Sequence, residues 1–551
     1  MAFIKKYYRI LTALVVFIVY LITLAPSVVQ IDSGELAAVQ ATLGIAHPTG
    51  YPLFTLLGYL FLKIPSPLSK ILMANLLAAL WCSIAVYIFM ITAELVLSNL
   101  PAFQLAKKEL PVKGKHKGKS PVANFLHRND DINENKKILS VSFGAFVLAF
   151  SRTFWSQSTS VEVYSLQLLL FTVIIYLLLK AVIISCSSKN GLRYWIFFAL
   201  ALALGFTNHM TTLFILPGTA YLYFNRYGFK KSSFNRIAIM LACFFPLLIA
   251  IYAYLPLRAS HNPMINWGNP IDFERILRHV SGKQYQVWLF SSMDSAKKQL
   301  GYFLSNLPSE FAVVSLLFCL LGLYNSFKLA GKFFLFSLIT MVFTVLYSIN
   351  YDIHDIDSYF LLAYISLAFF AVFGILKVFS LLKSNKNSYL VPSAITALFI
   401  TAQLYMNFRD VNQSGMHTFE DYTKSLIQST AQNSIIFSYQ WDYFISPSYY
   451  FQKVENFRPD AVIVDKELMR RSWYFNQLKR NHPELSSRLE PVSAPFLRAL
   501  QPFERDANFN AALLENLYRS MMSRLVQDNI SDHPFYIAPE LVENEMARGE
   551  F

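Results

Sequence analysis

The chain has 551 residues, of which 55% are hydrophobic, 16% aromatic and only 15% charged. Ordinary soluble domains carry about 25% charged residues, and a helix that crosses a bilayer needs about 20 apolar residues. Apolar runs of that kind recur along this sequence, which excludes a soluble globular protein. The net charge of +14 comes from the part before Asn412, because acids outnumber bases beyond it. This distribution favours the positive-inside rule of membrane proteins over nucleic-acid binding, for which the sequence has no motif.

Hydropathy and length predict about eleven transmembrane helices. The first follows Lys5, Lys6 and Arg9 and has no small-residue cleavage site after it, which indicates an uncleaved span with a cytoplasmic N-terminus. The predicted spans are 10–24, 72–97, 138–155, 163–184, 192–208, 210–225, 237–256, 311–327, 333–350, 359–381 and 388–407. The fifth and sixth spans abut, so they form either one bent hairpin or one long helix.

Two segments near the N-terminus decide the predicted orientation. The apolar run 51–64 is short and begins and ends near prolines, which is typical of an interfacial or re-entrant helix. Segment 107–119 contains six lysines and is therefore expected in the cytoplasm. The two expectations agree only if 51–64 does not cross the membrane. An odd number of spans then places the C-terminus outside.

From about Asn412 the sequence changes to a soluble pattern. Residues 434–438 and 460–465 are predicted to form short buried strands, with a helix at 447–457 between them and a later helix at 511–526. No glycine-rich phosphate loop is present, so an acceptor-binding or structural module is favoured over a nucleotide site. The predicted fold is an α-helical polytopic membrane protein, residues 1–411, followed by an extracytoplasmic α/β domain, residues 412–551.

The segment Ile31–Phe54 is the most informative part of the chain. It places Asp32 and Glu35 just beyond the first span, where a carboxylate is costly unless it is paired, solvated or functional. The same spacing spells a helix capping box, with Asp32 as the N-cap and Glu35 reaching back to it. Both interpretations stay open on the sequence alone.

Further polar and aromatic residues gather on the face predicted to lie outside. Residues on loops beyond a helix bundle that combine charge and aromaticity suggest a binding site. Each also has a structural explanation, such as an interfacial anchor for Arg152 or a hydrogen-bonded hairpin for His209. The candidate substrate-binding residues are His47, Tyr51, Arg152, Glu162, Tyr164, Asn208, His209, Arg258, Asn266, Trp267, His279, Tyr285, Asp355 and Tyr359. The histidine spacing does not match zinc, so a divalent metal is possible but not supported, and no cofactor is assigned.

Several motifs resemble those of known membrane enzymes. DSGEL (32–36) followed by AHPTGYPLF (46–54) resembles the first outer loop of the GT-C membrane glycosyltransferases. The likeness is to glycosyltransferase family 117, bacterial relatives of an animal transmembrane protein O-mannosyltransferase. The companion motifs are SVEVYSL (160–166), GFTNHMT (205–211), PLR (256–258) and NWGNP (266–270).

The resemblance implies an inverting transfer of a sugar from a polyprenyl-phosphate carrier to an exported acceptor, a protein Ser or Thr in the leading interpretation. The sugar is mannose-like or a preassembled glycan. Asp32 is then the catalytic carboxylate, a general base for the acceptor hydroxyl, with Glu35 beside it. The arginines Arg258 and Arg152 suit the lipid phosphate, because a guanidinium offers paired donors. The site of action implied is the periplasmic side of a bacterial inner membrane.

Two alternatives remain on the sequence. The first, within the same fold, has a lipid or a cell-envelope glycan as the acceptor. A secondary transporter or flippase of lipid-linked sugars is the alternative from another class, and such proteins place charges near the bilayer midplane and often contain repeats. Here the charges lie at span ends and no repeat is evident, which favours the enzyme.

Overall fold

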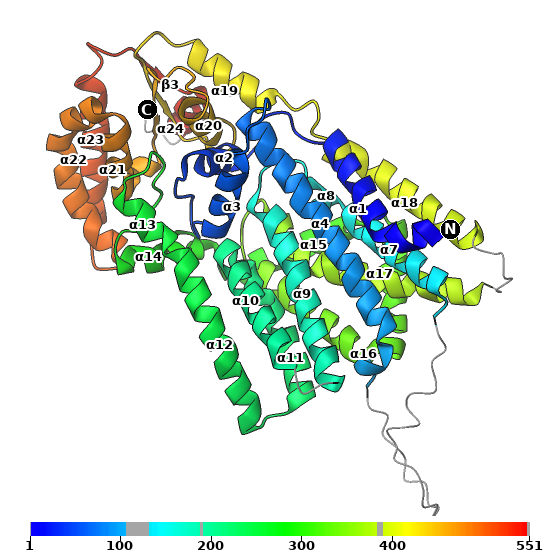
Figure 1. The fold of residues 1–551 in the computed structure, drawn as a ribbon. Coiled ribbons are helices and arrows are strands. Elements are labelled where there is room, and N and C mark those ends of the chain that lie inside the picture. Colours follow the sequence, from blue (N-terminus) through cyan, green and yellow to red (C-terminus); the bar gives the residue numbers. More distant parts are fainter. Residues whose placement is uncertain (1, 106–131, 188–190, 383–389, 548–551) are drawn as a thin grey trace, which may run out of the picture.

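The computed structural model describes residues 2–105, 132–187, 191–382 and 390–547, and these residues form a helical bundle with a smaller α/β part at one end (Figure 1). The lysine-rich segment 107–119 lies outside the described residues. Within them, six helical stretches are long and apolar enough to cross a membrane, and α3 and α10 are shorter apolar helices. The six stretches are Lys70–Ser98, Val163–Ser185, Lys231–Ser260, Val314–Ser348, Ile356–Leu381 and Leu390–Val411. The protein is therefore a multi-pass membrane protein.

Within the described residues the eleven predicted spans fall on helices, although not always one span to one helix. The helices of the bundle are α1 (Ala2–Ile22), α4 (Lys70–Ser98), α5 (Leu100–Phe103), α7 (Glu134–Ala149), α8 (Arg152–Ser156), α9 (Val163–Ser187), α10 (Leu192–Asn208), η3 (Met210–Ile215), α11 (Leu216–Tyr227), α12 (Lys231–Tyr252), α16 (Val314–Ser348), α17 (Leu361–Leu381) and α18 (Leu390–Val411). His209 is extended and ends α10, so the abutting spans 192–208 and 210–225 are two helices and not one.

Spans 311–327 and 333–350 join into the one helical stretch α16. Its single non-helical residue, Ala330, divides it into two legs. The first leg contacts α17 through Asn325, whose Nδ2 donates to the carbonyl oxygen of Phe373, and the second through the ring of Phe333 against Phe369. Because both legs cover it, α17 is the most deeply buried of the apolar helices.

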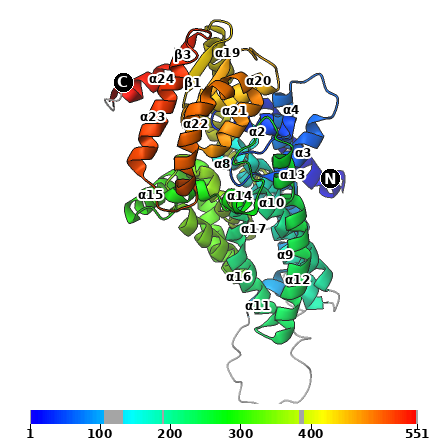
Figure 2. The same cartoon turned by 90° about the vertical axis from the view of Figure 1, so that its left-hand side faces the viewer.

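Short elements lie between the bundle and the α/β part (Figure 2). They are α2 (Ser33–Thr42), α3 (Pro52–Leu62), α13 (Tyr254–Ser260), α14 (Phe273–Val280), η4 (Lys283–Trp288), α15 (Met293–Glu310) and η5 (Ile356–Phe360). The helix α3 begins at Pro52, which suits the first turn of a helix because it needs no N–H donor there. With 11 residues α3 is about 16 Å long, too short to cross the roughly 30 Å hydrocarbon core.

The C-terminal part contains a three-stranded parallel sheet in the order β2-β1-β3. Its elements are α19 (Thr418–Gln428), β1 (Ile435–Ser438), η6 (Trp441–Ile445), α20 (Ser446–Lys453), β2 (Val462–Asp465), η7 (Leu468–Arg470), α21 (Ser472–Asn481), α22 (Pro483–Glu504), α23 (Ala511–Gln527), β3 (Phe535–Ile537) and α24 (Pro539–Ala547). The predicted β1–α20–β2 unit and the helix α23 are confirmed, whereas β3 escaped prediction because it has only three residues.

The α/β part is packed firmly against the bundle. Tyr450 and Phe451 of α20 belong to the same buried cluster as Phe54 of α3 and Trp81 of α4. Conversely, Trp267, which precedes α14, is buried among the side chains of the C-terminal core. The first of these clusters therefore packs the first outer segment against the C-terminal part, and the second does the same for the loop before α14.

Candidate functional site

Asp32 and Glu35 lie at the start of α2, one helical turn apart. The carboxylate of Glu35 is fully buried, and the Asp32 side chain is 22% exposed. Gly34 lies between them and lets α2 approach α20 closely, since a Cβ there would lie 2.3 Å from the carbonyl oxygen of Ser446. The glycine of DSGEL thus has a packing role.

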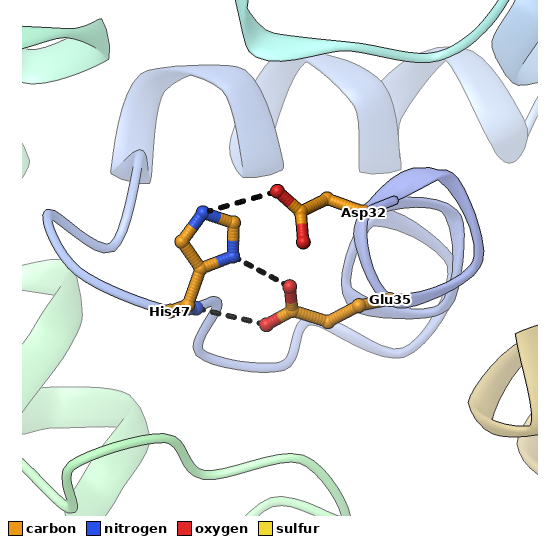
Figure 3. A group of neighbouring side chains, drawn as sticks. All are labelled: Asp32, Glu35 and His47. Atoms are coloured by element: carbon orange, nitrogen blue, oxygen red, sulfur yellow. Dashed lines mark hydrogen bonds and ion pairs between the residues drawn. The ribbon is translucent and has the colours of Figure 1, made fainter. Parts of the chain in front are cut away.

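His47 connects the two carboxylates (Figure 3). Its Nδ1 lies 2.6 Å from Oε2 of Glu35, and its backbone N–H donates to Oε1 of the same residue at 2.8 Å. Its Nε2 lies 3.7 Å from Oδ2 of Asp32 and 3.0 Å from the hydroxyl of Tyr51. The hydroxyl of Tyr51 donates to the carbonyl oxygen of Pro48, so it accepts from His47.

These contacts make His47 a cation. Burial alone lowers the pKa of His47, but the charges of Glu35 and Asp32 outweigh burial and raise it to about 10. Burial and the charge of Glu35 raise the pKa of Asp32 above its ordinary value, against the opposing effects of His47 and Trp441. A carboxylate with a raised pKa is a stronger base once it has ionised.

The capping-box interpretation is wrong. Asp32 occupies the N-cap position of α2, but its side chain makes no capping hydrogen bond. Glu35 does not reach back to the N-cap, because both of its oxygens bind His47. The two carboxylates therefore belong to a charged cluster and do not serve the helix end.

Asp32 and His47 line a cavity of about 690 Å³ at the end of the bundle next to the α/β part. Eight of the predicted substrate-binding residues line it: His47, Tyr51, Glu162, Tyr164, His209, Tyr285, Asp355 and Tyr359. Several of their rings form a connected wall, in which His209 stacks on Tyr51 at 5.9 Å and contacts Tyr164 at 4.9 Å and Tyr359 at 5.8 Å. The cavity thus combines aromatic faces with carboxylates.

Burial controls the charge of the other lining groups. Burial and the charge of Asp32 raise the pKa of Glu162 and of Asp355 above the ordinary carboxyl range. Burial and the nearby His47 cation lower the pKa of His209 to about 3, so its imidazole is neutral. Among the described residues that line the cavity there is no arginine or lysine, which leaves His47 as its cationic side chain.

Neither arginine predicted to bind phosphate lines the cavity. Nε of Arg258 donates to the carbonyl oxygen of Leu43 at 2.8 Å, which ties α13 to the end of α2. The Arg152 side chain is half exposed, and its Nε lies 3.8 Å from Asp410. The phosphate role predicted for both arginines is thus not supported by their positions, because a sequence does not report where a long side chain points.

Four more predicted residues do not line the cavity and instead hydrogen-bond or pack nearby: Asn208, Asn266, Trp267 and His279. Asn208 donates from Nδ2 to the carbonyl oxygen of Val163 and to Gln167. The backbone N–H of Asn266 donates to Gln477 of α21. Trp267 contacts His47 at 6.1 Å between ring centroids, and His279 is buried against Gly50, where a Cβ would lie 2.9 Å from its Nε2. Burial lowers the pKa of His279 to about 3, so it is neutral.

Residues outside the predicted substrate-binding set also contribute to the site, and the one that contacts Asp32 comes from a distant segment. Trp441 of η6 donates from Nε1 to Oδ1 of Asp32 at 2.6 Å. Gln157 and Tyr351 also line the cavity. Gln157 lies within the polar stretch after Arg152, which was a usable signal, whereas nothing near Trp441 in the sequence links it to Asp32.

Asp32, Glu35 and His47 place one possible ligand atom each within 4.8 Å of one another. In this arrangement, however, Nδ1 of His47 binds Glu35 and Nε2 faces Tyr51 and Asp32. Both ring nitrogens are therefore engaged within the cluster, and a protonated imidazole offers no lone pair to an ion. The three side chains are therefore joined in one charged network.

Known proteins match this chain in sequence over most of its length. The N-terminal domain of the protein O-mannosyl-transferase TMEM260 matches residues 32–233, and TMEM260-associated domain 2 matches residues 419–492. The chain is 25% identical over 489 residues to protein O-mannosyl-transferase TMEM260 from Mus musculus, covering 84% of this chain and 63% of the relative. It is 24% identical over 510 residues to the Dictyostelium discoideum protein of the same name, covering 83% and 57%. The chain thus spans about three fifths of the length of these relatives.

The fold is also similar to a solved structure. ArnT from Cupriavidus metallidurans superimposes with a TM-score of 0.52 in the apo state and 0.50 with bound undecaprenyl phosphate. The alignment covers 85% of this chain and 91% of ArnT at 11% sequence identity, so it speaks for the fold. The chain is therefore a membrane protein that is similar in sequence to the TMEM260 protein O-mannosyl-transferases and similar in fold to ArnT.

Proposed function

We propose that this protein transfers a sugar, mannose-like or a preassembled glycan, from a polyprenyl-phosphate carrier to a serine or threonine hydroxyl of an exported protein. Two relatives are named protein O-mannosyl-transferases, and the structural neighbour ArnT binds undecaprenyl phosphate. The membrane is the bacterial inner membrane, with the N-terminus in the cytoplasm and the cavity and C-terminal part in the periplasm.

One observation carries the proposal: an ionisable carboxylate, Asp32, lies in the wall of a large cavity at the end of the membrane bundle. In the transfer, the acceptor oxygen forms a bond to the anomeric carbon while the bond from that carbon to the phosphate oxygen breaks. Asp32 takes the hydroxyl proton, and the electron pair of the broken bond leaves with the lipid phosphate. A single displacement of this kind inverts the anomeric centre, and the mechanism needs no second nucleophilic carboxylate.

The remaining lining groups suit the two ends of the donor. His47 is the cationic side chain among the cavity-lining residues that the structure describes, so it replaces the predicted arginines as the phosphate's charge partner. The rings of Tyr51, Tyr164 and Tyr359 offer apolar faces and hydroxyls, a combination that orients a sugar by contact and by hydrogen bonds. Glu162 and Asp355 supply further oxygens for sugar hydroxyls.

The test is transfer from a polyprenyl-phosphate sugar to an exported protein by Asp32→Asn. The variant keeps the shape of the side chain and one oxygen to accept from Trp441, but it removes the base. We expect transfer to fall by about a hundredfold or more, the usual cost of losing a general base, with donor binding retained. Asp410→Asn is the control, because Asp410 is a carboxylate outside the cavity that pairs with Arg152.

Protein amount and melting temperature are measured in parallel. Near-normal transfer by Asp32→Asn would remove the base from the mechanism. Equal losses in Asp32→Asn and Asp410→Asn would assign the effect to general destabilisation. Transfer of sugar only to lipid or envelope glycan, with no protein product from the wild-type enzyme, would replace the protein acceptor.

A further inference from the structure

The carboxylate of Asp32, the proposed base, accepts a hydrogen bond from the C-terminal part of the chain. Nε1 of Trp441 donates to Oδ1 of Asp32 at 2.6 Å, although 409 positions separate the two residues. Trp441 begins η6, a π-helical turn, and such turns are rare and are often found at functional sites. A donor to an ionised carboxylate forms one of the stronger hydrogen bonds in proteins.

Two further bonds lock the same segments together. The backbone N–H of Ile31 donates to the carbonyl oxygen of Asp442 at 2.9 Å, and that of Glu35 donates to Oγ of Ser446 at 3.0 Å. The three bonds lie on both sides of Gly34, where the backbones of α2 and α20 approach most closely. The C-terminal part therefore holds the DSGEL segment at its backbone and at its catalytic side chain.

The indole itself has little freedom to turn. Its ring meets Trp267 edge to face at 5.1 Å and Tyr449 at 6.0 Å. Trp267 is in turn packed against Trp473 at 4.9 Å. An N–H fixed in this way can hold one carboxylate oxygen in place, because its own ring is oriented by neighbours on both sides.

We propose that Trp441 is a positioning residue for Asp32: its N–H occupies Oδ1, so that Oδ2 takes the proton from the acceptor hydroxyl. The inference rests on the proposed function, since it assumes that Asp32 is the base. The hydrogen bond also favours the ionised form of Asp32 against the effect of burial. The α/β part thereby completes the catalytic site that the membrane bundle begins.

Other titratable groups surround Asp32 and also shift its pKa. Carboxylates oppose its ionisation, and His47 favours it. The groups that face it are Glu35 of α2, His47 and Tyr51 before α3, Glu162 before α9, Tyr285 of η4, Asp355 before η5 and Asp442 of η6. A change at Trp441 alone leaves all of these in the chain, so its effect on Asp32 can be separated.

The experiment compares Trp441→Phe with Trp473→Phe in the full-length protein. Both variants exchange an indole for a phenyl ring in the same aromatic cluster, but only Trp441 donates to Asp32. We expect Trp441→Phe to lose roughly tenfold to a hundredfold in transfer rate. We also expect the acid limb of its pH–rate profile to move to higher pH by about one unit, because the ionised form of Asp32 has lost a donor. Trp473→Phe should leave the limb in place.

A second substitution and a second measurement keep the result decisive. Replacing Trp441 by 3-benzothienylalanine keeps the shape of the ring and removes only the N–H, so it serves if Trp441→Phe does not fold. Infrared titration of the protonated carboxyl band that disappears in Asp32→Asn measures the ionisation of Asp32 without any substrate. We expect its midpoint to rise in both Trp441 variants.

The outcomes separate the inference from the proposed function. An infrared midpoint and an acid limb that do not move in the Trp441 variants would overturn the positioning role, even if the wild-type enzyme transfers sugar. A midpoint that moves in a protein that transfers no sugar would uphold the contact with Asp32 and overturn the proposed function. Equal shifts in the Trp441 and Trp473 variants would assign the effect to loss of packing and overturn the positioning role as well.

Discussion

The charge of the site depends on a few side chains that neutralise one another. Glu35 is fully buried, and both of its carboxylate oxygens bind His47, one at the backbone N–H and one at Nδ1. The other ring nitrogen of His47, Nε2, faces Asp32. A buried carboxylate is tolerated when it is paired and hydrogen-bonded, which describes Glu35. Its partner His47 thereby carries positive charge into a cavity that is otherwise lined by carboxyl groups, tyrosines and the neutral His209.

The first residue-scale prediction concerns this pair. Glu35→Gln removes the carboxylate charge, so the pKa of His47, now about 10, should fall. With its raised pKa, wild-type His47 loses its proton only as the pH rises past about 10. In the variant the pKa is lower, so His47 loses its proton, and its positive charge, closer to neutral pH. We expect donor affinity to decline between about pH 7 and pH 9 in the variant while the wild-type affinity stays level, measured as donor Kd.

Glu515→Gln is the control for Glu35→Gln, because it also removes a paired carboxylate, from Arg470 in the C-terminal part. A pH-independent donor Kd in Glu35→Gln would show that His47 does not serve as the cation for the phosphate.

The second residue-scale prediction concerns Arg258. Because its guanidinium binds the carbonyl oxygen of Leu43 and does not line the cavity, Arg258→Ala should lower the melting temperature and leave donor Kd unchanged. Loss of one hydrogen bond to a charged group costs about 1.5–3 kcal/mol of unfolding free energy. A weakened donor Kd in a variant with normal melting temperature would restore the phosphate role that its sequence position suggested.

The sequence could predict the local part of the site and not its distant part. Asp32, Glu35 and His47 lie within one short loop, so their spacing alone brings them near one another. Tyr164 and His209 were identified because polar residues at span ends stand out against apolar sequence. Trp441 could not be found in this way, because its partner lies 409 positions earlier and tryptophan is unremarkable in a folded α/β core.

At the scale of elements, the contact between α2 and α20 determines how the site is held. The helices meet where Gly34 lies against the backbone of Ser446. Hydropathy and length predicted the spans well, because a helix in a bilayer needs a long apolar run regardless of which helices it contacts. It did not predict that two spans form the single kinked stretch α16, or that a soluble helix would press on the first outer segment.

Gly34→Ala tests this contact. The added Cβ would lie 2.3 Å from the carbonyl oxygen of Ser446, so the two helices must separate. Overpacking of this kind costs about 1–3 kcal/mol of unfolding free energy, and we expect a lower melting temperature and lost transfer. Gly301→Ala is the matched control, since a Cβ there meets nothing within 4 Å in α15. Equal melting temperatures in the two variants would contradict the close contact.

At the scale of the whole molecule, the bundle and the C-terminal part share two buried clusters, one around Tyr450 and Phe451 and one around Trp267. The cavity lies where they meet. The loop between α11 and α12 and the C-terminal part lie at opposite ends of the molecule (Figure 1). The proposed orientation, with the C-terminal part outside, rests on the charge distribution in the sequence.

Cysteine labelling tests the orientation. In a variant without native cysteines, Phe229→Cys, between α11 and α12, and Asn508→Cys, between α22 and α23, introduce thiols at exposed positions. We expect a membrane-impermeant reagent added to the periplasmic side to modify position 508 and to reach position 229 only after the membrane is opened. Modification of both from the same side would contradict the proposed topology.

The bond between Asp32 and Trp441 has a consequence for biosynthesis. A ribosome makes Asp32 early and Trp441 409 residues later, so a nascent chain already inserted by its first helices lacks the donor to its base. On the proposed topology, the α/β part must also be exported before it can dock on α2. The newly inserted protein would therefore work below its full rate throughout translation and translocation, and would reach that rate only after its own export is complete.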